Sequence, residues 1–590
     1  MSAISDTKTN TNTIRKPMGR LRRWARGLSA EESIKAVLII CILFVFAIFL
    51  LFPLIMLFIK AFENKDGSFA GVSQFAKYLT SKNMMISLGN TVYISVFSTV
   101  IAVGLAFIFA YSLTRKNIPC KKLFRFGAML PMFAPTMLLG IALVYIMGKK
   151  GLLTAMGLKL PLYGKLGIIA AESIYCFPVA LMILTVAFSN ADNRLYEAAE
   201  VMDTSALRKL LTITLPSVKY GLINAIFVCF TYSFTDFGAP SVVGGNVSVL
   251  STDVYKQVIG QQNFNMGAVV GIFMMIPTVI SFIVDRITGR KQDQAVSSKA
   301  VPYVIKKHAP TDILCTIYCA LVTAALAAFF AVAFYGSVVT FWPYNKTLTF
   351  KHYDFSTVAA GSGKAAIYQS VKVAIFTALI GTALAFITAY CVEKLGKFSR
   401  LRKCIYFFAI APNAVPGTVI GLSYILFFNP LVFPIGNTGY GIENSFNFLY
   451  GTTMILIIVN IIHYFSVPFV TASTALKKLD REYETVSESL KVPFYKTFWR
   501  ITVPMSINAI LEMVTYYFTN AMITVSAVVF LYTPLTKVAS IVVLNCDGAG
   551  NEAEACAICM VIMAINLIVR FIYELVNKVV AKRASRWVVR

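Results

Sequence analysis

The chain contains few charged residues and very few acidic ones. Only 14% of its 590 residues are Asp, Glu, Lys or Arg, whereas about a quarter are charged in a typical soluble protein. The 27 acidic residues are outnumbered by 54 basic ones. Because 57% of the residues are hydrophobic and the mean hydropathy is +0.72, the composition excludes an ordinary soluble fold and indicates a polytopic membrane protein.

Histidine is scarcer still, with 3 residues in the whole chain. Cys556 and Cys559 form an isolated C-x-x-C in an apolar run, without the second pair or nearby histidine that a zinc site needs. The apolar runs contain no HExxH or GxSxG motif, and Gly361–Lys364 lacks the upstream glycine and the following Ser or Thr of a phosphate loop. We therefore predict no catalytic residue, no metal site and no cofactor in this chain, and a function other than catalysis.

What is present is a series of apolar runs, each about the length that a helix needs to cross the hydrocarbon core. We expect an all-α polytopic membrane protein with about 12 transmembrane helices. The runs lie near residues 35–59, 90–113, 124–148, 166–189, 217–236, 266–286, 312–337, 367–391, 404–428, 448–475, 506–531 and 555–577.

The basic residues are dispersed among short loops, which argues against nucleic-acid binding and for the asymmetry that orients membrane helices. They concentrate at both termini and after the second, sixth and eighth runs. With 12 spans these segments share one side, which the positive-inside rule makes cytoplasmic. We expect a multi-pass protein of the bacterial inner membrane with both termini in the cytoplasm and lipid as a surrounding partner.

The two parts of the chain repeat each other in the same order. Leu105–Tyr111 recurs as Leu384–Tyr390, and Phe234–Asp236 resembles Phe518–Asn520. Six spans per copy make the two six-helix repeats parallel. We therefore divide the chain into a basic tail (1–34), a first half (35–287), a linker (288–311), a second half (312–577) and a second basic tail (578–590).

Two polar segments between apolar runs, residues 192–216 and 480–504, also correspond without gaps. We expect each to form two short helices. Asp192 suits the start of the first helix, Ser205 or Thr204 the start of the second, and Pro216 its end. Asp203 lies at the break, where an acidic residue tolerates left-handed backbone better than most. Lys491 occupies the same position in the second copy.

The first segment resembles the cytoplasmic coupling loop of the permeases of binding-protein-dependent ABC importers. That loop reads Glu-Ala-Ala, three residues, Gly, nine residues, Ile, one residue and Leu-Pro, and the second segment matches it less well. The resemblance implies that both loops dock on an ABC ATPase dimer that binds ATP and Mg²⁺. The implied coupling residues are Glu197, Ala198, Ala199, Asp203, Leu215 and Pro216, and in the second loop Glu484, Thr485, Lys491, Trp499 and Pro504.

Prolines and polar residues inside the apolar runs are candidates for a transport pathway. A proline removes a helix hydrogen bond, and the freed carbonyl must find a partner or face a watery cavity. A carboxylate in a span is costly unless it meets water or a partner. Kinked packing helices or an interfacial carboxylate remain alternatives. The candidates are Pro131, Pro135, Tyr232, Asp236, Pro412, Pro416, Tyr516 and Asn520.

The resemblance implies a fused permease, with both membrane halves in one chain and an extracytoplasmic substrate-binding protein as a further partner. The stretches Phe234–Gly245 and Val254–Phe264 look most like the 2-aminoethylphosphonate branch, so a phosphonate is the expected substrate. Ferric iron is the alternative, and the thiamine and polyamine permeases share the architecture. A 12-helix secondary transporter also has two parallel six-span repeats, but it does not account for the two matched loops.

Overall fold

The computed structural model describes residues 30–64, 66–295, 301, 303–358, 361–395, 398–434, 441–480 and 482–588. Almost all of the basic tail predicted at 1–34 lies outside these residues, as do part of the linker predicted at 288–311 and the last two residues of the tail predicted at 578–590. The described chain is almost entirely helical, with two short antiparallel hairpins.

The first half contains the helices α2 to α15. Their bounds are α2 Ala30–Phe46, η1 Ala47–Leu51, α3 Phe52–Ala61, α4 Ser73–Thr80, α5 Lys82–Arg115, α6 Lys121–Met129, η2 Leu130–Phe133, α7 Thr136–Met147, α8 Leu152–Ala155, α9 Lys165–Ser189, α10 Asn193–Val201, α11 Ala206–Lys209, η3 Leu210–Thr214, α12 Leu215–Thr235, α13 Gly238–Val243, α14 Leu250–Tyr255, η4 Lys256–Gly260 and α15 Phe264–Ala295.

The second half contains the helices α16 to α27 and both hairpins. The bounds are α16 Ala309–Val338, β1 Val339–Phe341, β2 Asn345–Leu348, η5 Lys351–Tyr353, α17 Gly363–Glu393, α18 Ser399–Ile410, η6 Ala411–Ala414, α19 Gly417–Phe428, β3 Val432–Pro434, β4 Gly441–Glu443, η7 Asn447–Leu449, α20 Thr453–His463, α21 Ser466–Lys478, α22 Glu482–Ser489, α23 Phe494–Thr497, η8 Phe498–Thr502, α24 Val503–Met505, α25 Ile507–Ile523, α26 Ala539–Gly548 and α27 Glu552–Val588.

The all-α polytopic fold is confirmed. Nine helices of the described chain are long and apolar enough to cross a membrane, or eleven if each of two bent pairs forms one span. One pair bends by 111° between α18–η6 and α19, and the other by 54° between α20 and α21. The span predicted near 506–531 is the shorter helix α25, of 17 residues.

Three packed helices form the centre of each half: α5, α9 and α12 in the first, and α17, α21 and α25 in the second. Small residues permit the close approach. A Cβ added to Gly221 would lie 2.3 Å from the Cβ of Ala187, and one added to Gly381 would lie 2.9 Å from the ring of Tyr517. A larger side chain at either glycine would push the helices apart.

The first span of each half packs against the other half. Helices α2 and α3 lie along α18 and α19. Phe46 contacts Phe408 of α18 and Phe465, between α20 and α21, through ring pairs with centroids 6.3 and 5.0 Å apart. Helix α16 lies along α5, α6 and α7 of the first half, and the Tyr318 hydroxyl donates to the Leu105 carbonyl at 2.8 Å. Each half is therefore completed by a helix that belongs to the other in sequence, while α3 also packs on α15 and α16 on α27 of its own half.

The prolines of the third and ninth spans break their helices instead of kinking them. In each span a short 3₁₀ turn carries the first proline, and the second proline caps a new helix, α7 or α19. Carbonyls at the breaks accept bonds from the opposite half: Asn566 Nδ2 donates to Phe133 O at 3.0 Å, and Thr278 Oγ1 donates to Ala414 O at 2.8 Å. A helix break inside a membrane leaves backbone carbonyls without a hydrogen bond, and these side chains supply one.

Three π-helical turns precede prolines. The turns η1, η3 and η8 each end two residues before a proline, at Pro53, Pro216 and Pro504. Proline cannot donate a hydrogen bond, and a wider turn accommodates the interruption without ending the helix. The prediction that Pro216 ends a helix is therefore wrong, because residues 206–235 form one continuous helix.

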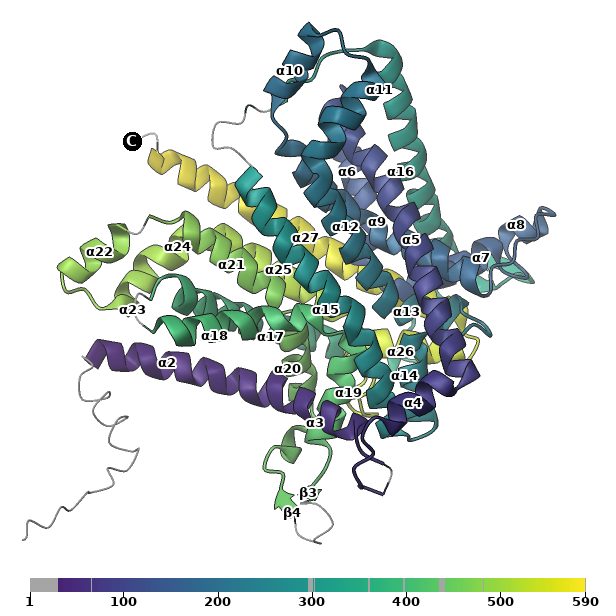
Figure 1. Ribbon diagram of the computed structural model, residues 1–590. Helices are drawn as coiled ribbons and strands as arrows, with labels where there is room; N and C mark the ends of the chain where they lie inside the picture. Colours follow the sequence, from purple (N-terminus) through teal and green to yellow (C-terminus); the bar gives the residue numbers. More distant parts are fainter. Residues whose placement is uncertain are drawn as a thin grey trace, which may run out of the picture.

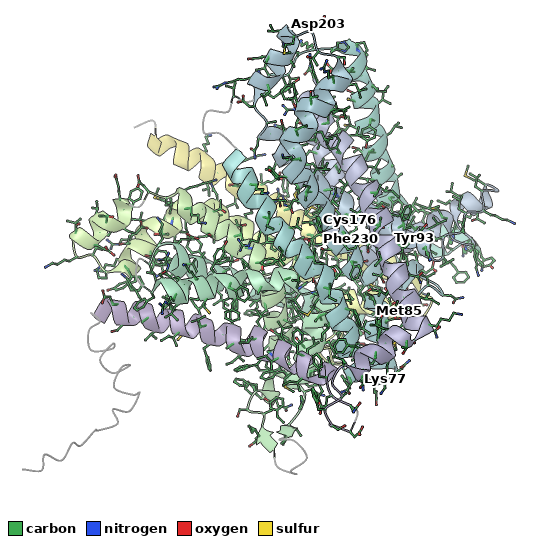
Figure 2. The ribbon with its side chains drawn as sticks, in the orientation of Figure 1. Lys77, Met85, Tyr93, Cys176, Asp203 and Phe230 are labelled. Atoms are coloured by element: carbon green, nitrogen blue, oxygen red, sulfur yellow. The ribbon has the colours of Figure 1, made fainter. Side chains whose placement is uncertain are left out.

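The halves meet at one end and diverge towards the other. Figure 1 shows α10 and α11 at the top of the first half and α22 and α23 at the left of the second, far apart in this view. At the opposite end the Tyr255 and Phe530 rings of the two halves lie 6.2 Å apart. Figure 2 shows the same spread: Asp203 lies at the tip of the first half, well away from Cys176 and Phe230 near the centre.

Candidate coupling loops and translocation pathway

The first polar loop folds as predicted up to its second helix. The Asp192 side chain caps α10 by accepting the Arg194 N–H at 3.1 Å, and the Ser205 hydroxyl caps α11 by accepting the Arg208 N–H at 3.4 Å. Between the two helices Asp203 has φ +48°. The left-handed break predicted at Asp203 is confirmed.

The second loop repeats this geometry 288 positions later, which is the shift from Asp192 to Asp480. Asp480 accepts the Glu482 N–H at 3.2 Å, and Pro493 begins α23. Lys491 has φ +53°, although a lysine gains nothing from the left-handed region. The turn thus keeps its conformation in a loop whose sequence has diverged.

Both loops expose apolar side chains at equivalent positions. Exposed fractions range from 42% at Tyr483 to 77% at Met202. Exposed apolar faces of this kind are typical of interaction surfaces. The matched pairs are Leu195 and Tyr483, Met202 and Leu490, Leu207 and Tyr495, and Leu211 and Trp499.

We call α10 and α22 the first and second coupling helices. The residues Glu197, Ala198 and Ala199 lie on two different sides of α10. Ala199 is buried, as is its counterpart Ser487, while Glu197 is exposed and accepts a bond from Asn193 Nδ2 at 2.6 Å. Ala198 and Thr485 are exposed. The small residue at 199 therefore lets the helix lie close to the membrane half beneath it.

A cation from the second span of each half lies under that half's loop. Arg115 at the end of α5 is buried, donates to Phe188 O at 2.8 Å and lies 5.0 Å from the Tyr196 ring centroid. Lys394, just after α17, donates to Leu479 O and to Glu484 Oε2, both at 3.1 Å. Glu484 corresponds to Tyr196 by the shift of 288, so the second loop replaces a cation–π contact with an ion pair.

Candidate pathway residues of the first half lie at the end of α12 and at the break between η2 and α7. Asp236 follows the last residue of α12, and its carboxylate accepts the Ala239 N–H at 2.9 Å. The next turn lies against the break after Pro135, because a Cβ added to Gly238 would lie 2.0 Å from Thr136 Oγ1. The rings of Pro131, Pro135, Pro412 and Pro416 are buried.

Tyrosines of each half form a ring pair. The Tyr175 and Tyr232 rings of the first half stack with centroids 6.1 Å apart, and the Tyr464 and Tyr516 rings of the second half meet edge to face at 6.2 Å. We call these four residues, two from each half, the tyrosine cluster. The Asn520 amide donates to its own helix at Tyr516 O, 2.8 Å away.

Sequence reasoning missed a buried carboxylate inside the membrane. Glu172 on α9 is 1% exposed, and the hydroxyls of Ser98 and Ser233 donate to its Oε2, from 3.3 Å in the case of Ser98. A charged residue in the middle of the run 166–189 was the available signal. Under the shift of 288 its counterpart in the second half is Asn460, so only the first half has an ionisable side chain at this position.

The repeated halves and their loops match one known protein family twice. The family described as "Binding-protein-dependent transport system inner membrane component" matches residues 102–294 and again 381–582. The chain belongs to this family. Its members are membrane permease subunits of ABC transporters and not enzymes, and two matches in one chain make this a fused permease.

Two ferric permeases match most of this chain, and a third relative matches less than half of it. The ferric transport system permease protein FbpB of Actinobacillus pleuropneumoniae is 28% identical over 92% of this chain and 78% of its own. A putative FbpB 1 of Haemophilus influenzae is 27% identical over 86% of this chain and 79% of its own. A putative 2-aminoethylphosphonate permease protein, PhnU of Salmonella typhimurium, is 25% identical over 42% of this chain and 90% of its own.

The permease repeat also corrects one sequence correspondence. The match of Phe234–Asp236 to Phe518–Asn520 is one helical turn out of register, because α12 ends before Asp236 and α25 ends before Thr524. Ser251 Oγ donates to Asp236 O at 2.6 Å, and Ser540 Oγ donates to Thr524 O at 2.7 Å. The shift of 288 therefore holds from the coupling loops to the ends of these helices.

Proposed function

We propose that this permease forms the membrane pathway of an ATP-driven importer for ferric iron. The substrate proposal rests on how much of the chain each relative matches. The ferric permeases match both halves of the chain, whereas the 2-aminoethylphosphonate permease matches less than half of it. The alternative substrate named from the sequence is thus favoured over the phosphonate.

The oxygen-bearing side chains of the candidate pathway suit such a cargo. A hard, highly charged cation prefers oxygen donors, and the tyrosine cluster and Asp236 offer phenol and carboxylate oxygens. No group of three or more His, Cys, Asp or Glu side chains forms a metal site among the described residues. Scattered single donors support weak, stepwise binding, which lets an ion enter and leave a pathway.

The energy comes from a separate ATPase dimer that docks on α10 and α22. The matched apolar residues of both loops, on the cytoplasmic side by the positive-inside rule, support that docking. A binding protein delivers the substrate at the opposite face. The spread of the two loops in Figure 1 fits an inward-facing state, from which ATP draws the loops together as rigid bodies.

The test is uptake in a strain lacking this gene. We expect loss of ⁵⁵Fe(III) uptake and unchanged growth on 2-aminoethylphosphonate as sole phosphorus source, with both traits measured again after complementation. Tyr516→Phe, which removes a cluster hydroxyl, should lower iron uptake more than Tyr517→Phe, whose hydroxyl faces Ile461 O at 3.5 Å inside the second half. Normal iron uptake with lost phosphonate growth would assign the other substrate.

A further inference from the structure

The first span of each half, residues 30–61 (α2 to α3) and 309–338 (α16), packs on the other half, and we call these two the swapped spans. They begin at equivalent places. Helix α2 starts beside the second coupling helix, where Lys35 Nζ lies 4.0 Å from Glu488 Oε1 and 5.3 Å from the Phe494 ring centroid. Helix α16 follows a segment that crosses the first coupling helix, and there Lys306 forms an ion pair with Glu200. Glu200 and Glu488 are the same position under the shift of 288, so one arrangement occurs twice.

The segment before α16 is bound along α10 by its backbone. We call residues 301 and 303–308 the strap. The Asn193 N–H donates to Val301 O at 3.0 Å, and the Val301 N–H donates to Asp192 Oδ1 at 3.2 Å. The Val304 N–H donates to Asn193 Oδ1 at 3.2 Å. The strap thus uses polar groups at the start of α10 that would otherwise face water.

Two side chains extend this contact. The Tyr303 ring lies 4.1 Å from the Arg115 guanidinium and 5.0 Å from the Tyr196 ring, so it covers the cation under the loop. Hydrogen bonding from the Lys306 ammonium lowers the pKa of the Glu200 carboxyl. A tyrosine stacked on a buried guanidinium is a stronger contact than an exposed ion pair.

We propose that Lys306 and Tyr303 on one side, and Lys35 on the other, tie each coupling helix to the swapped span packed on the same half. The inference rests on the proposed function, because it requires an ATPase that moves the coupling helices. A swapped span is joined through the chain to the opposite half, and the halves move relative to each other during transport. The ties keep α16 with the first half and α2 with the second, so that each swapped span follows the coupling helix it touches.

These residues are positioning residues, and their loss should reduce coupling and not assembly. The experiment uses the whole complex, with the co-purified ATPase, in vesicles and with binding protein loaded with ⁵⁵Fe(III). The measured quantity is iron transported per ATP hydrolysed. Lys306→Glu should lower this ratio by up to about fivefold, the limit for an exposed pair, and adding Glu200→Lys should restore it. Lys307→Glu, one residue away, is the matched control.

A second measurement does not depend on the substrate. Spin labels at Val201 on α10 and Ile313 on α16, both exposed, report the distance between the coupling helix and the swapped span. The labels require replacement of the exposed cysteines Cys41, Cys120 and Cys404 by serine. In the parent this distance should stay the same when ATP and vanadate are added, while Lys306→Glu with Tyr303→Ala should make it change.

The outcomes separate the two proposals. A parent complex that hydrolyses ATP but moves no iron contradicts the proposed substrate, and the label distances then still decide the role of the strap. A parent-like transport ratio and constant distance in the Lys306→Glu, Tyr303→Ala variant would overturn the tie. Failure of the Glu200→Lys charge exchange to restore the ratio would show that the two residues act independently and would overturn it as well.

Discussion

Removal of the Glu484 carboxylate should destabilise the permease more than removal of Glu197, although the sequence motif emphasises Glu197. The Lys394 side chain is only 5% exposed and that of Glu484 19% exposed. Glu484→Ala removes one of the two hydrogen bonds of the Lys394 ammonium and leaves the one to Leu479 O. A lost charged hydrogen bond costs about 1.5–3 kcal/mol, and more when the remaining charge is fully buried.

Glu197→Ala removes the bond that the buried Asn193 amide donates to an exposed carboxylate. Water can take the place of that carboxylate, so we place the cost at about 0.5–1 kcal/mol. The difference of roughly 1–2 kcal/mol should appear as a lower apparent Tm of Glu484→Ala in detergent, followed by fluorescence-detected size exclusion. Glu488→Ala, at a carboxylate 75% exposed, serves as the control and should have little effect.

A double-mutant cycle identifies the cause. In a Lys394→Met background the ammonium is absent, so Glu484→Ala should then cost little. An equal loss in both backgrounds, or equal losses from Glu484→Ala and Glu197→Ala, would refute the argument that the buried cation sets the cost.

Three further predictions concern the two loops and Asp547 of α26. Trp499→Ala should reduce ATPase co-purification more than Leu211→Ala, because the indole presents more apolar area at the same exposed position; equal retention of ATPase would contradict this. Lys491→Gly should raise the apparent Tm, with a gain of about 1 kcal/mol from relief of its positive φ, and Asp203→Gly should give a smaller gain; melting curves of both variants provide the test. Burial raises the pKa of the Asp547 carboxyl from 3.8 to about 6. Because the folded pKa is the higher one, stabilisation by the bound proton is complete below about pH 4 and is lost as the pH rises through 6, by up to about 3 kcal/mol. Melting measured from pH 4 to 7 should therefore show this decline in the parent and less of it in Asp547→Asn.

Local chemistry allowed much of the loops to be predicted. A polar segment between two apolar runs is easily located, and the caps at Asp192 and Ser205 follow from side-chain oxygens that reach nearby N–H groups. The left-handed break at Asp203 followed from a family glycine and from the residue that replaces it. Such features depend on neighbours within a few residues, and the sequence displays those directly.

Features set by distant contacts were not predicted. The continuation of the helix through Pro216 depends on a π-turn that the periodicity of an apolar run does not reveal. The register at Asp236 was misplaced by one turn because Phe518-Thr519 repeats the residues Phe234-Thr235. The true counterpart lies four residues later in the chain. Nothing local to α2 or α16 indicates that each packs on the opposite half, since lipid and protein favour the same apolar side chains.

The swapped first span has a consequence for biosynthesis. Helix α3 ends at Ala61, and its partner α19 begins at Gly417. At roughly 5–20 residues per second, the ribosome needs on the order of 20–70 seconds to make the chain between them. During that time the first inserted span has no second half to pack against. The Phe49 carbonyl at its π-turn lacks the hydrogen bond that the Tyr424 hydroxyl donates to it at 2.6 Å in the finished protein. The first half alone is therefore not an assembly unit, and halves produced as separate chains would have to exchange these helices before either could close.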